Sequence, residues 1–525
     1  MSRADVGEAV ASGDPRPVDG RPGRRVSWLE IGAIAAIVGI FLAIGVAVIG
    51  RHAPFSHDES VYALRARLYA GVPTEGTYWA DYRAPGLPVL LRLAYEVRPS
   101  DGALRMVPLL LAAGLIVLAW AWGRHLVGPA TGLLTAGLLT LTPGFHRFAW
   151  QLLLDTPGAF FAMAAVLTFT LATGKDRIGT WALLAIPLAA FATAVRFGAP
   201  VLVVAGMGAV ALVRWRSLLS RPWLSLATLA GTAAGMLAVL TVPGLTGATK
   251  PPLVAFRDFR VRKGNPFGRS YAEFADVGPA LLGRFVGWIV AAGLVLAIVV
   301  AVRHKAERGS LAIAFVMLTA FVLGLGLALG QGRGSYLTPA LVPLHVLAAT
   351  GLAWAASRLP RGIVALAILG SATVALSLTY SAGVTESNRM RLAFDPLTRA
   401  ARAAGEAASG HCVVFTSYTP QAGWYSGCSA ISYLPQMYQA DSDDTDEESI
   451  VEEWFRRSVD PVSRCSDDAY LIEVKGGKRS LLGPIRSTLG ARLSRVVAEF
   501  GEPDARRLRH VIVTEMALCD RTKSP

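Results

Sequence analysis

Charge is scarce in this 525-residue sequence: only 17% of its residues are Asp, Glu, Lys or Arg, whereas 53% are hydrophobic. Asparagine is nearly absent, because only Asn265 and Asn388 occur, and neither lies in an N-x-S/T sequon. Arginine also greatly outnumbers lysine. This composition indicates high-GC coding and hence a bacterial protein, and the scarcity of charge excludes an ordinary soluble protein of this length.

Several nucleotide and hydrolase motifs are missing as well. The sequence contains no Walker loop, no G-x-G-x-x-G after a strand, no H-E-x-x-H and no G-x-S-x-G in a strand-turn-helix setting. No repeat of 20–50 residues is visible either, which excludes a solenoid. Nothing in the sequence therefore provides for ATP-driven transport.

Long apolar runs are abundant, and runs of this length are typical of membrane-spanning helices. The polar, Pro/Gly-rich residues 1–27 lack the apolar content to fold and are expected to be a disordered tail. The first run lacks a convincing cleavage site, which indicates an uncleaved anchor. We predict an α-helical polytopic membrane protein with about eleven transmembrane helices, near residues 28–49, 104–122, 128–142, 156–173, 178–195, 198–213, 223–243, 278–302, 310–330, 336–356 and 362–381.

The basic residues predict the orientation of these helices. With a cytoplasmic N-terminus, the connections on the inside are short and basic, as the positive-inside rule requires. The formal net charge of +14 is then mostly topology and needs no nucleic acid. We predict an inner (plasma) membrane protein with an extracytoplasmic C-terminus. The inside connections carry Arg124, Lys175, Arg177, Arg214, Arg216, Arg221, Arg303, Lys305, Arg308, Arg358 and Arg361.

The cysteines support this orientation independently. All four lie beyond the last predicted span, namely Cys412, Cys428, Cys465 and Cys519. Two disulfides would suit an oxidising compartment, and three pairings are possible.

Residues 385–525 are predicted to form a small extracytoplasmic α/β domain. The segments 411–418, 469–474 and 510–518 are rich in β-branched and aromatic residues and indicate strands. The segments 395–409 and 447–459 indicate helices. The acidic run 441–448 lacks the spacing of a calcium loop and fits a solvated helix start better.

Ionisable residues recur at the external ends of the predicted spans, where they are functional candidates by default. The adjacent acids Asp58 and Glu59 open the first external loop, at 51–103, which should also contain juxtamembrane helices. Asp155 and Arg196 lie at later external junctions. The same side should also carry Arg333, Tyr336 and a basic loop at 244–277 that includes Arg260, Arg262 and Lys263.

Each of these residues also has a structural explanation. Asp155 could cap a helix, and Arg196 could reach the lipid headgroups. Arg333 could pair with Asp58 or Asp155, and the basic loop could bind anionic lipid without specificity. A helix start favours acidic residues, but it accounts for only one of two adjacent carboxylates.

Four segments, in this order, resemble the GT-C membrane glycosyltransferases of the glycosyltransferase family 39, protein O-mannosyltransferase and aminoarabinose-transferase type. The resemblance covers about residues 28–380, so that 28–384 would be the transferase domain. Pro-Gly-Leu-Pro stands where relatives often have Lys-Pro-Pro-Leu, and the loop at 244–277 is unusually basic. The segments are HDESVYALRARLYAGVPTEGTYWADYRAPGLPVLL, LLLDTPGAFF, ATAVRFGAP and GRGSYLTPALVPLHVLAATGLAW.

The resemblance implies transfer of a sugar from a polyprenyl-phosphate carrier to an extracytoplasmic acceptor, with inversion. It implies a catalytic role for Asp58, Glu59 and Asp155. The donor phosphate or lipid would be bound by Arg196, Arg333, Tyr336, Arg260, Arg262 and Lys263, and the acceptor or its loop by His57, Tyr62, Tyr82 and Arg83.

Three questions stay open at this point. No cofactor is indicated, but a divalent metal such as Mg²⁺ or Mn²⁺ could take part, with His57 more simply a hydrogen-bonded loop residue. A lipid-linked sugar transporter or flippase is an alternative, and it predicts broken helices with polar residues at mid-membrane. A non-catalytic protein of cell-envelope assembly is the other alternative.

Overall fold

The computed structural model describes the helical part of the chain almost completely and the C-terminal part by its strands and one helix. The described residues are 26–72, 83–174, 177–246, 250–255, 257, 270–328, 333–409, 411–432, 468–475, 493–501 and 510–517.

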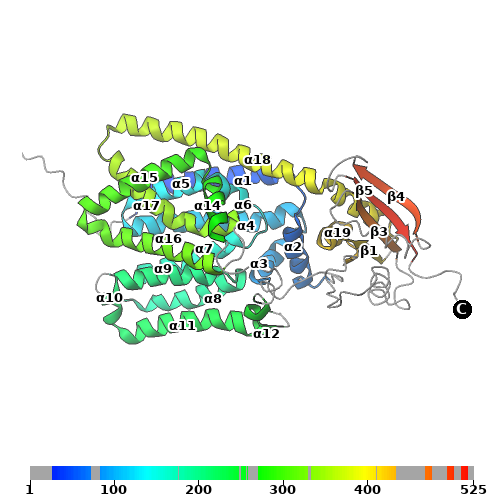
Figure 1. Cartoon of the computed structure of the whole chain (residues 1–525), viewed down its shortest axis with the longest axis horizontal. Coiled ribbons are helices and arrows are strands. Elements are labelled where there is room, and N and C mark those ends of the chain that lie inside the picture. Colours follow the sequence, from blue (N-terminus) through cyan, green and yellow to red (C-terminus); the bar gives the residue numbers. More distant parts are fainter. Residues whose placement is uncertain are drawn as a thin grey trace, which may run out of the picture.

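A bundle of long apolar helices makes up most of the molecule (Figure 1). Each of the eleven predicted segments contains a helix, and eight of the described helices are long and apolar enough to cross a membrane. The other three, at 129–141, 180–195 and 199–213, are shorter. The multi-pass membrane fold is confirmed, and eleven spans remain a prediction. The helices are α1 (Trp28–Ile49), α4 (Asp101–Leu126), α5 (Pro129–Leu141), α7 (Asp155–Ala172), η1 (Thr180–Leu184) with α8 (Ala185–Val195), α9 (Ala199–Val213), α11 (Pro222–Thr241), α15 (Arg284–Arg303), α16 (Arg308–Ala328), η3 (Gly334–Ala340) with α17 (Leu341–Ala356), and α18 (Arg361–Ala407).

Short helices connect the long ones. They are α6 (Pro143–Ala149), α10 (Trp215–Leu219), α12 (Pro243–Thr246), α14 (Ser270–Leu282) and η2 (Lys305–Glu307). The predicted span at 278–302 is divided, because Gly283 takes a φ of 71° between α14 and α15. Glycine adopts such a backbone without the steric cost that other residues meet.

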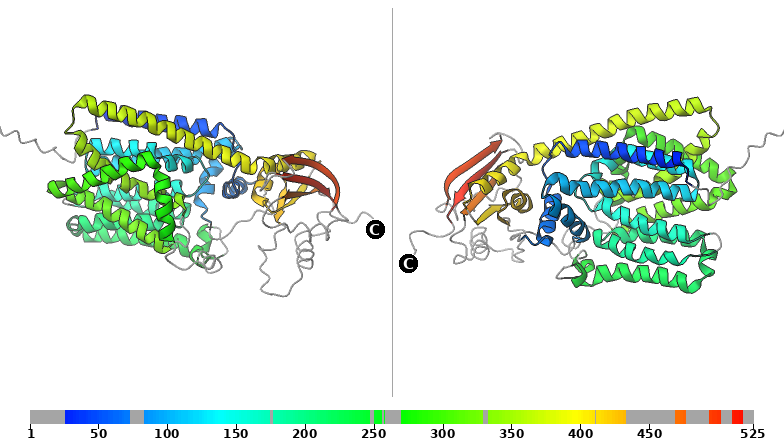
Figure 2. Two further views of the ribbon diagram at one scale, coloured as in Figure 1. Left: turned by 45° about the horizontal axis from the view of Figure 1, so that its top comes forward. Right: turned by 180° about the vertical axis from the view of Figure 1, so that it is seen from behind.

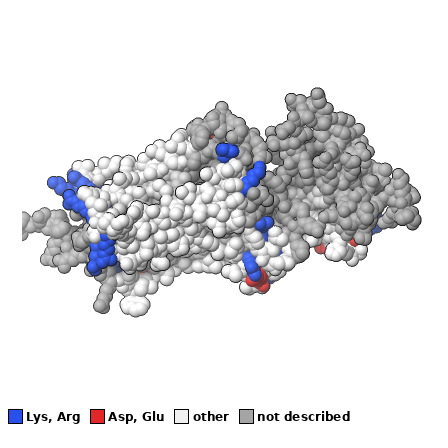
Figure 3. All heavy atoms as spheres, turned by 90° about the horizontal axis from the view of Figure 1, so that it is seen from below, with Lys and Arg blue, Asp and Glu red and all other residues white. Residues whose placement is uncertain are grey.

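The surface of the bundle matches a membrane environment. Figure 3 shows lysine and arginine gathered at one end of the bundle and again near the C-terminal part, with an uncharged surface between them. Exposed tryptophans lie at or near the starts of several helices, as Trp28 in α1, Trp223 in α11 and Trp288 in α15 illustrate. An apolar surface bounded by charges and tryptophans is typical of a protein that spans a bilayer.

The loop at 51–103, predicted to be external, contains two helices, α2 (His57–Tyr69) and α3 (Gly86–Val97). They lie between the bundle and the C-terminal sheet (Figures 1 and 2). Helix α2 contacts both α3 and α19 (Thr419–Ser426), so the loop is packed on both sides. The predicted juxtamembrane helices are therefore present.

Helix α18 joins the bundle to the C-terminal part without a break. Its 47 residues unite the predicted span at 362–381 with the predicted helix at 395–409, and Pro396 lies inside it. The expected domain boundary at 384/385 thus falls within a continuous helix. The end of α18 packs against the sheet through Leu397, Ala400, Ala401 and Ala404.

The C-terminal part is built on a five-stranded sheet of order β2-β1-β3-β5-β4. The first three strands in that order are parallel, whereas β5 is antiparallel to β3 and β4. The three predicted strands are present, and β2, β4 and α19 had not been predicted. The predicted helix at 447–459, the acidic run at 441–448, Cys465 and Cys519 lie outside the described residues. The strands are β1 (Cys412–Thr416), β2 (Ser429–Ser432), β3 (Asp468–Lys475), β4 (Leu493–Gly501) and β5 (His510–Met516).

Close approach of α15 and α17 depends on small residues. A Cβ added at Gly351 would meet backbone atoms of the facing helix, including the nitrogen of Ala297 at 2.6 Å. Gly293 on α15 is equally close to Ala348. Glycine at such contacts lets helix backbones pack closely in a membrane, where packing rather than the hydrophobic effect drives association.

We therefore expect Gly351→Ala to lower the free energy of unfolding by about 1–3 kcal/mol, the usual cost of overpacking. Thermal unfolding of purified protein in detergent measures this. Gly370→Ala in α18 is the matched control, because nothing lies within 4 Å of a Cβ there. Equal loss of stability in both variants would contradict the packing argument.

Candidate active site

Helix α2 positions the acidic pair. Ser56 is its N-cap, and the Ser56 N–H donates to Glu59 Oε2 at 2.9 Å. Asp58 and Glu59 both lie in the first turn, where carboxylates interact favourably with the helix dipole. The two side chains nevertheless have different surroundings, because consecutive residues of a helix point about 100° apart.

Glu59 faces the protein interior and is fully buried. Arg105 of α4, also buried, donates from Nε to Glu59 Oε1 at 3.0 Å and from Nη2 to Oε2 at 3.1 Å. With the Ser56 N–H, the Leu152 N–H completes a set of four hydrogen bonds to Glu59, at 3.2 Å from Oε1. A buried carboxylate is stable only when its lone pairs are satisfied in this way.

Arg105 is fixed on its other sides as well. It donates to the carbonyl oxygens of Ala53 and Pro54, the latter at 3.1 Å. Its guanidinium also lies 4.8 Å from the ring centre of Phe55 and 5.0 Å from that of Trp150. The Glu59–Arg105 pair thus joins α2, the segment before α2, α4 and the segment before α7.

Asp58 faces the open side. Its side chain is 39% exposed and pairs with Arg83, whose Nη2 lies 3.0 Å from Asp58 Oδ1. The Arg83 guanidinium also lies 5.7 Å from the ring centre of Tyr62, one turn further along α2. Burial raises the pKa of the Tyr62 hydroxyl, Arg83 lowers it and Asp58 raises it again. The phenol is therefore a neutral hydrogen-bonding group.

A second acid–base pair stands at the start of α7. Asp155 is buried and forms an ion pair with Arg196, which follows α8. The Arg196 guanidinium lies 5.0 Å from the ring centre of Tyr336 in η3. Gly158 makes room for this arrangement, because a Cβ there would lie 2.8 Å from the Arg196 side chain. Asp155 therefore holds an arginine and forms no side-chain cap.

The two acid–base pairs form one cluster. Tyr62 lies beside Arg83 and Tyr336 lies beside Arg196, and the two phenols are close enough to interact electrostatically with each other and with Arg196. Five segments far apart in the sequence supply its members. The cluster consists of Asp58, Tyr62, Arg83, Asp155, Arg196 and Tyr336.

A narrow pocket opens beside this cluster. It lies between α7, the start of α9, α16 and η3, and Arg196 is its charged member. The remaining lining is apolar or glycine, and the cavity volume is only about 10 Å³, close to the space of one water molecule. Lining residues include Gly158, Gly198, Phe321, Leu325 and Pro339.

The other predicted site residues are less central or lie outside the described residues. His57 is exposed at the start of α2, and Arg333 is exposed just before η3. Asp58 and Asp155, the possible partners of Arg333, pair instead with Arg83 and Arg196, respectively. The residues outside the described ranges are Tyr82, Arg260, Arg262 and Lys263.

Sequence reasoning missed Arg105. The available signal was an arginine placed four residues inside a long apolar helix, because ionisable groups there have a partner or a function. Arg83 was predicted to contact the acceptor or its loop, and in the structure it pairs with Asp58.

In this arrangement Glu59 is not free to bind a metal. Among the described residues, no group of three His, Cys, Asp or Glu side chains converges as a metal would require. Glu59 is occupied by Arg105, so His57, Asp58 and Glu59 cannot act together as ligands.

We expect Glu59→Ala to lower the free energy of unfolding by about 3–5 kcal/mol, because it leaves the Arg105 charge buried without a partner. Glu96→Ala removes an exposed i,i+4 pair with Arg92 and should cost about 0.5 kcal/mol. Thermal unfolding in detergent compares the two. A Glu59→Ala variant as stable as Glu96→Ala would contradict a structural role for Glu59.

Comparison with known proteins gives one family match and several matches of fold. Residues 82–241 match the family model described as dolichyl-phosphate-mannose-protein mannosyltransferase. A search of curated proteins finds no match.

Solved structures match over nearly the whole chain. Apo ArnT from Cupriavidus metallidurans has a TM-score of 0.62 at 15% identity and covers 95% of this chain and 100% of that one. The same protein bound to undecaprenyl phosphate gives 0.60 at 14% identity, covering 94% and 99%.

The oligosaccharyltransferase AglB from Archaeoglobus fulgidus, in complex with an inhibitory peptide and a dolichol-phosphate, gives 0.52 at 13% identity, covering 95% and 75%. The helical bundle, the loop helices α2 and α3 and the C-terminal sheet, together with these matches, identify the chain as a multi-pass membrane protein with the GT-C architecture of the ArnT-like glycosyltransferases.

Proposed function

We propose that this protein transfers a sugar from a polyprenyl-phosphate donor to an extracytoplasmic acceptor, with inversion at the anomeric carbon. One observation carries the proposal: the partly exposed carboxylate of Asp58 shares a cluster with Arg83 and Arg196, and Arg196 also lines a small apolar pocket. The acceptor would be a protein, a glycolipid or a cell-wall polysaccharide.

The donor matches this arrangement in chemical character. A polyprenyl-phosphate sugar combines an apolar chain with a phosphate, and the surroundings of Arg196 combine apolar side chains with a cation. ArnT and AglB, which share the fold, have been solved with undecaprenyl phosphate and a dolichol-phosphate. The exposed Arg333 and the basic residues Arg260, Arg262 and Lys263 are proposed as further contacts of the phosphate or lipid.

The chemistry follows from the charges. The acceptor hydroxyl gives its proton to Asp58 while its oxygen forms a bond to the anomeric carbon. The bond between that carbon and the phosphate oxygen breaks, and polyprenyl phosphate leaves with one additional negative charge. Arg83 and Arg196 stabilise that charge in a site with little water, where fixed cations act strongly.

The three acids then have different roles. Asp58 is the catalytic residue, since its side chain is accessible and lies beside the cations. Asp155 positions Arg196, and Glu59 holds the base of α2 through Arg105. Tyr62 and Tyr336 bracket the space between the two arginines and are proposed to contact donor or acceptor hydroxyls.

The proposed function requires the site to face the extracytoplasmic side, and the distribution of basic residues supports this orientation. Helix α2 and the C-terminal sheet lie at one end of the bundle (Figure 1), and lysine and arginine gather at the opposite end as well as near the C-terminal part (Figure 3). By the positive-inside rule, the site faces the extracytoplasmic side of a bacterial inner membrane. A flippase would instead need polar residues at mid-membrane, whereas this cluster is at helix ends.

Asp58→Asn should lower transfer by about 10²–10⁴-fold, the usual contribution of a positioned general base. The assay follows loss of each donor from a panel of polyprenyl-phosphate sugars, with purified protein and a pool of envelope acceptors. Glu96→Gln, an exposed acid on α3, is the matched control and should retain full activity. If the unaltered protein consumes no donor of the panel, the proposed function is wrong.

Arg196→Ala should raise the KM for the donor by about 10- to 100-fold, the equivalent of one lost hydrogen bond to a charged group. Arg196→Ala alone leaves the Asp155 carboxylate buried without its partner. The double variant Arg196→Ala/Asp155→Asn removes that charge, so that an effect on donor binding can be told apart from a loss of stability. Arg92→Ala, at an exposed pair, serves as control. An unchanged donor KM in the double variant would exclude Arg196 from donor binding.

A further inference from the structure

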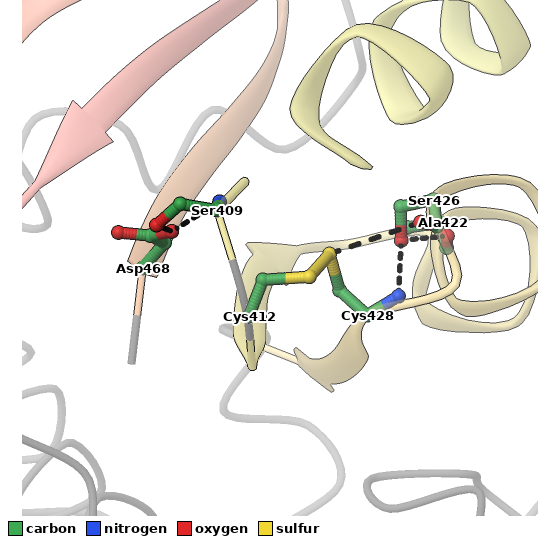
Figure 4. The surroundings of a disulfide bond; sticks show 6 residues. All are labelled: Ser409, Cys412, Ala422, Ser426, Cys428 and Asp468. Carbon is green, nitrogen blue, oxygen red and sulfur yellow. Dashed lines mark hydrogen bonds between the residues drawn. A yellow bond between two sulfur atoms is a disulfide. The ribbon is translucent and has the colours of Figure 1, made fainter. Parts of the chain in front are cut away.

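Helix α19 of the C-terminal part is constrained by a disulfide. Cys412 at the start of β1 is bonded to Cys428 just before β2, so the bond closes the segment that contains α19 (Figure 4). Ser426 tightens the end of the helix, because its Oγ accepts from the Cys428 N–H at 3.0 Å and donates to the Ala422 carbonyl oxygen at 2.7 Å. Gly427 then reverses the chain with a φ of 75°.

Two aromatic residues of α19 form hydrogen bonds with the helical bundle. Trp424 Nε1–H donates to Asp101 Oδ1 at 2.8 Å, and the Tyr425 hydroxyl donates to Asp101 Oδ2 at 2.6 Å. The same hydroxyl accepts the Phe55 N–H at 2.7 Å. One phenol therefore joins three elements: α19, the first turn of α4 and the chain that enters α2.

These contacts are close to the machinery of the proposed site. Phe55 immediately precedes Ser56, the N-cap of α2, and Asp58 is the second residue of that helix. Asp101 lies one turn before Arg105, which binds Glu59. The Phe55 ring also contacts both Trp424, at a centroid distance of 5.5 Å, and the Arg105 guanidinium.

We propose that Tyr425 is a positioning residue, through which the disulfide-closed α19 fixes the N-terminus of α2 and hence the direction of the Asp58 carboxylate. The C-terminal domain would then be required for turnover as well as for stability. This inference rests on the proposed glycosyl transfer. It concerns a residue that touches neither donor nor acceptor and acts only through Phe55 and Asp101.

The local chemistry explains why the hydroxyl matters. Phenylalanine at position 425 would keep the ring contact with Phe55 but would leave the Asp101 carboxylate and the Phe55 N–H each short of one partner. An unpaired polar group in a buried place is expensive, so the entry to α2 would shift to reach another partner. A displacement of about 1 Å at a reacting group can reduce a rate substantially.

The test compares Tyr425→Phe, Asp101→Asn, the double variant and Tyr418→Phe in steady-state transfer. We expect Tyr425→Phe to lower kcat about 10-fold and to leave the donor KM within about twofold, because ground-state binding is not its task. The double variant should be no worse than the poorer single variant, since both changes break one interaction. Tyr418→Phe makes the same chemical change in the C-terminal part, where Tyr418 packs against the core of the sheet, and should behave as the unaltered protein.

A second readout separates this inference from the proposed function. Hydrogen exchange of the backbone amides at 55–60 should be faster in Tyr425→Phe than in Tyr418→Phe, whether or not a donor is turned over. Unaltered kcat in Tyr425→Phe, with the unaltered protein active, overturns the inference. If the unaltered protein is inactive, the proposed function fails, and equal exchange in the two variants overturns the positioning as well.

Discussion

Glu59 and Arg105 form a buried ion pair, so two full charges are removed from water. The arrangement of the helices around the candidate site depends on that contact. Burying such a pair is costly unless every lone pair and donor is satisfied. Here the backbone at Ala53, Pro54, Ser56 and Leu152 completes the set. These hydrogen bonds come from the chain that enters α2 and from the segment before α7. The pair therefore fixes α2 on the bundle in one register. Its neighbour Asp58 is then directed to the open side.

The same constraint explains why two acids stand next to each other in the sequence. One is a structural member of a buried network, and the other is presented on the surface that this network holds rigid. In the second acid–base pair, the buried Asp155 at the start of α7 likewise fixes the position of Arg196, which follows α8. A site made from five separate segments thereby obtains fixed cations without a metal ligand set among the described residues. Such preorganised charges are the most effective form of electrostatic stabilisation.

Sequence patterns predicted the helices, three strands and most of the clustered residues, because apolar runs and β-branched runs are local signals. They did not predict Arg105 or Tyr425, whose importance comes from partners 46 and 324 residues away in the sequence. The continuity of α18 was missed for a related reason. Pro396 and the polar stretch before it indicate a helix end, but packing of Leu397, Ala400 and Ala404 on the sheet overrides that local preference.

The unbroken α18 also bears on the role of α19. A single helical connection fixes the distance of the C-terminal sheet from the bundle, but it leaves rotation about the helix axis and bending at Pro396 as soft motions. A second attachment away from that axis removes them. The hydrogen bonds of Trp424 and Tyr425 to Asp101 are such an attachment, and they end on the helix that also carries Arg105. The sheet, α2 and α4 are thus held as one unit around the acid that faces the open side.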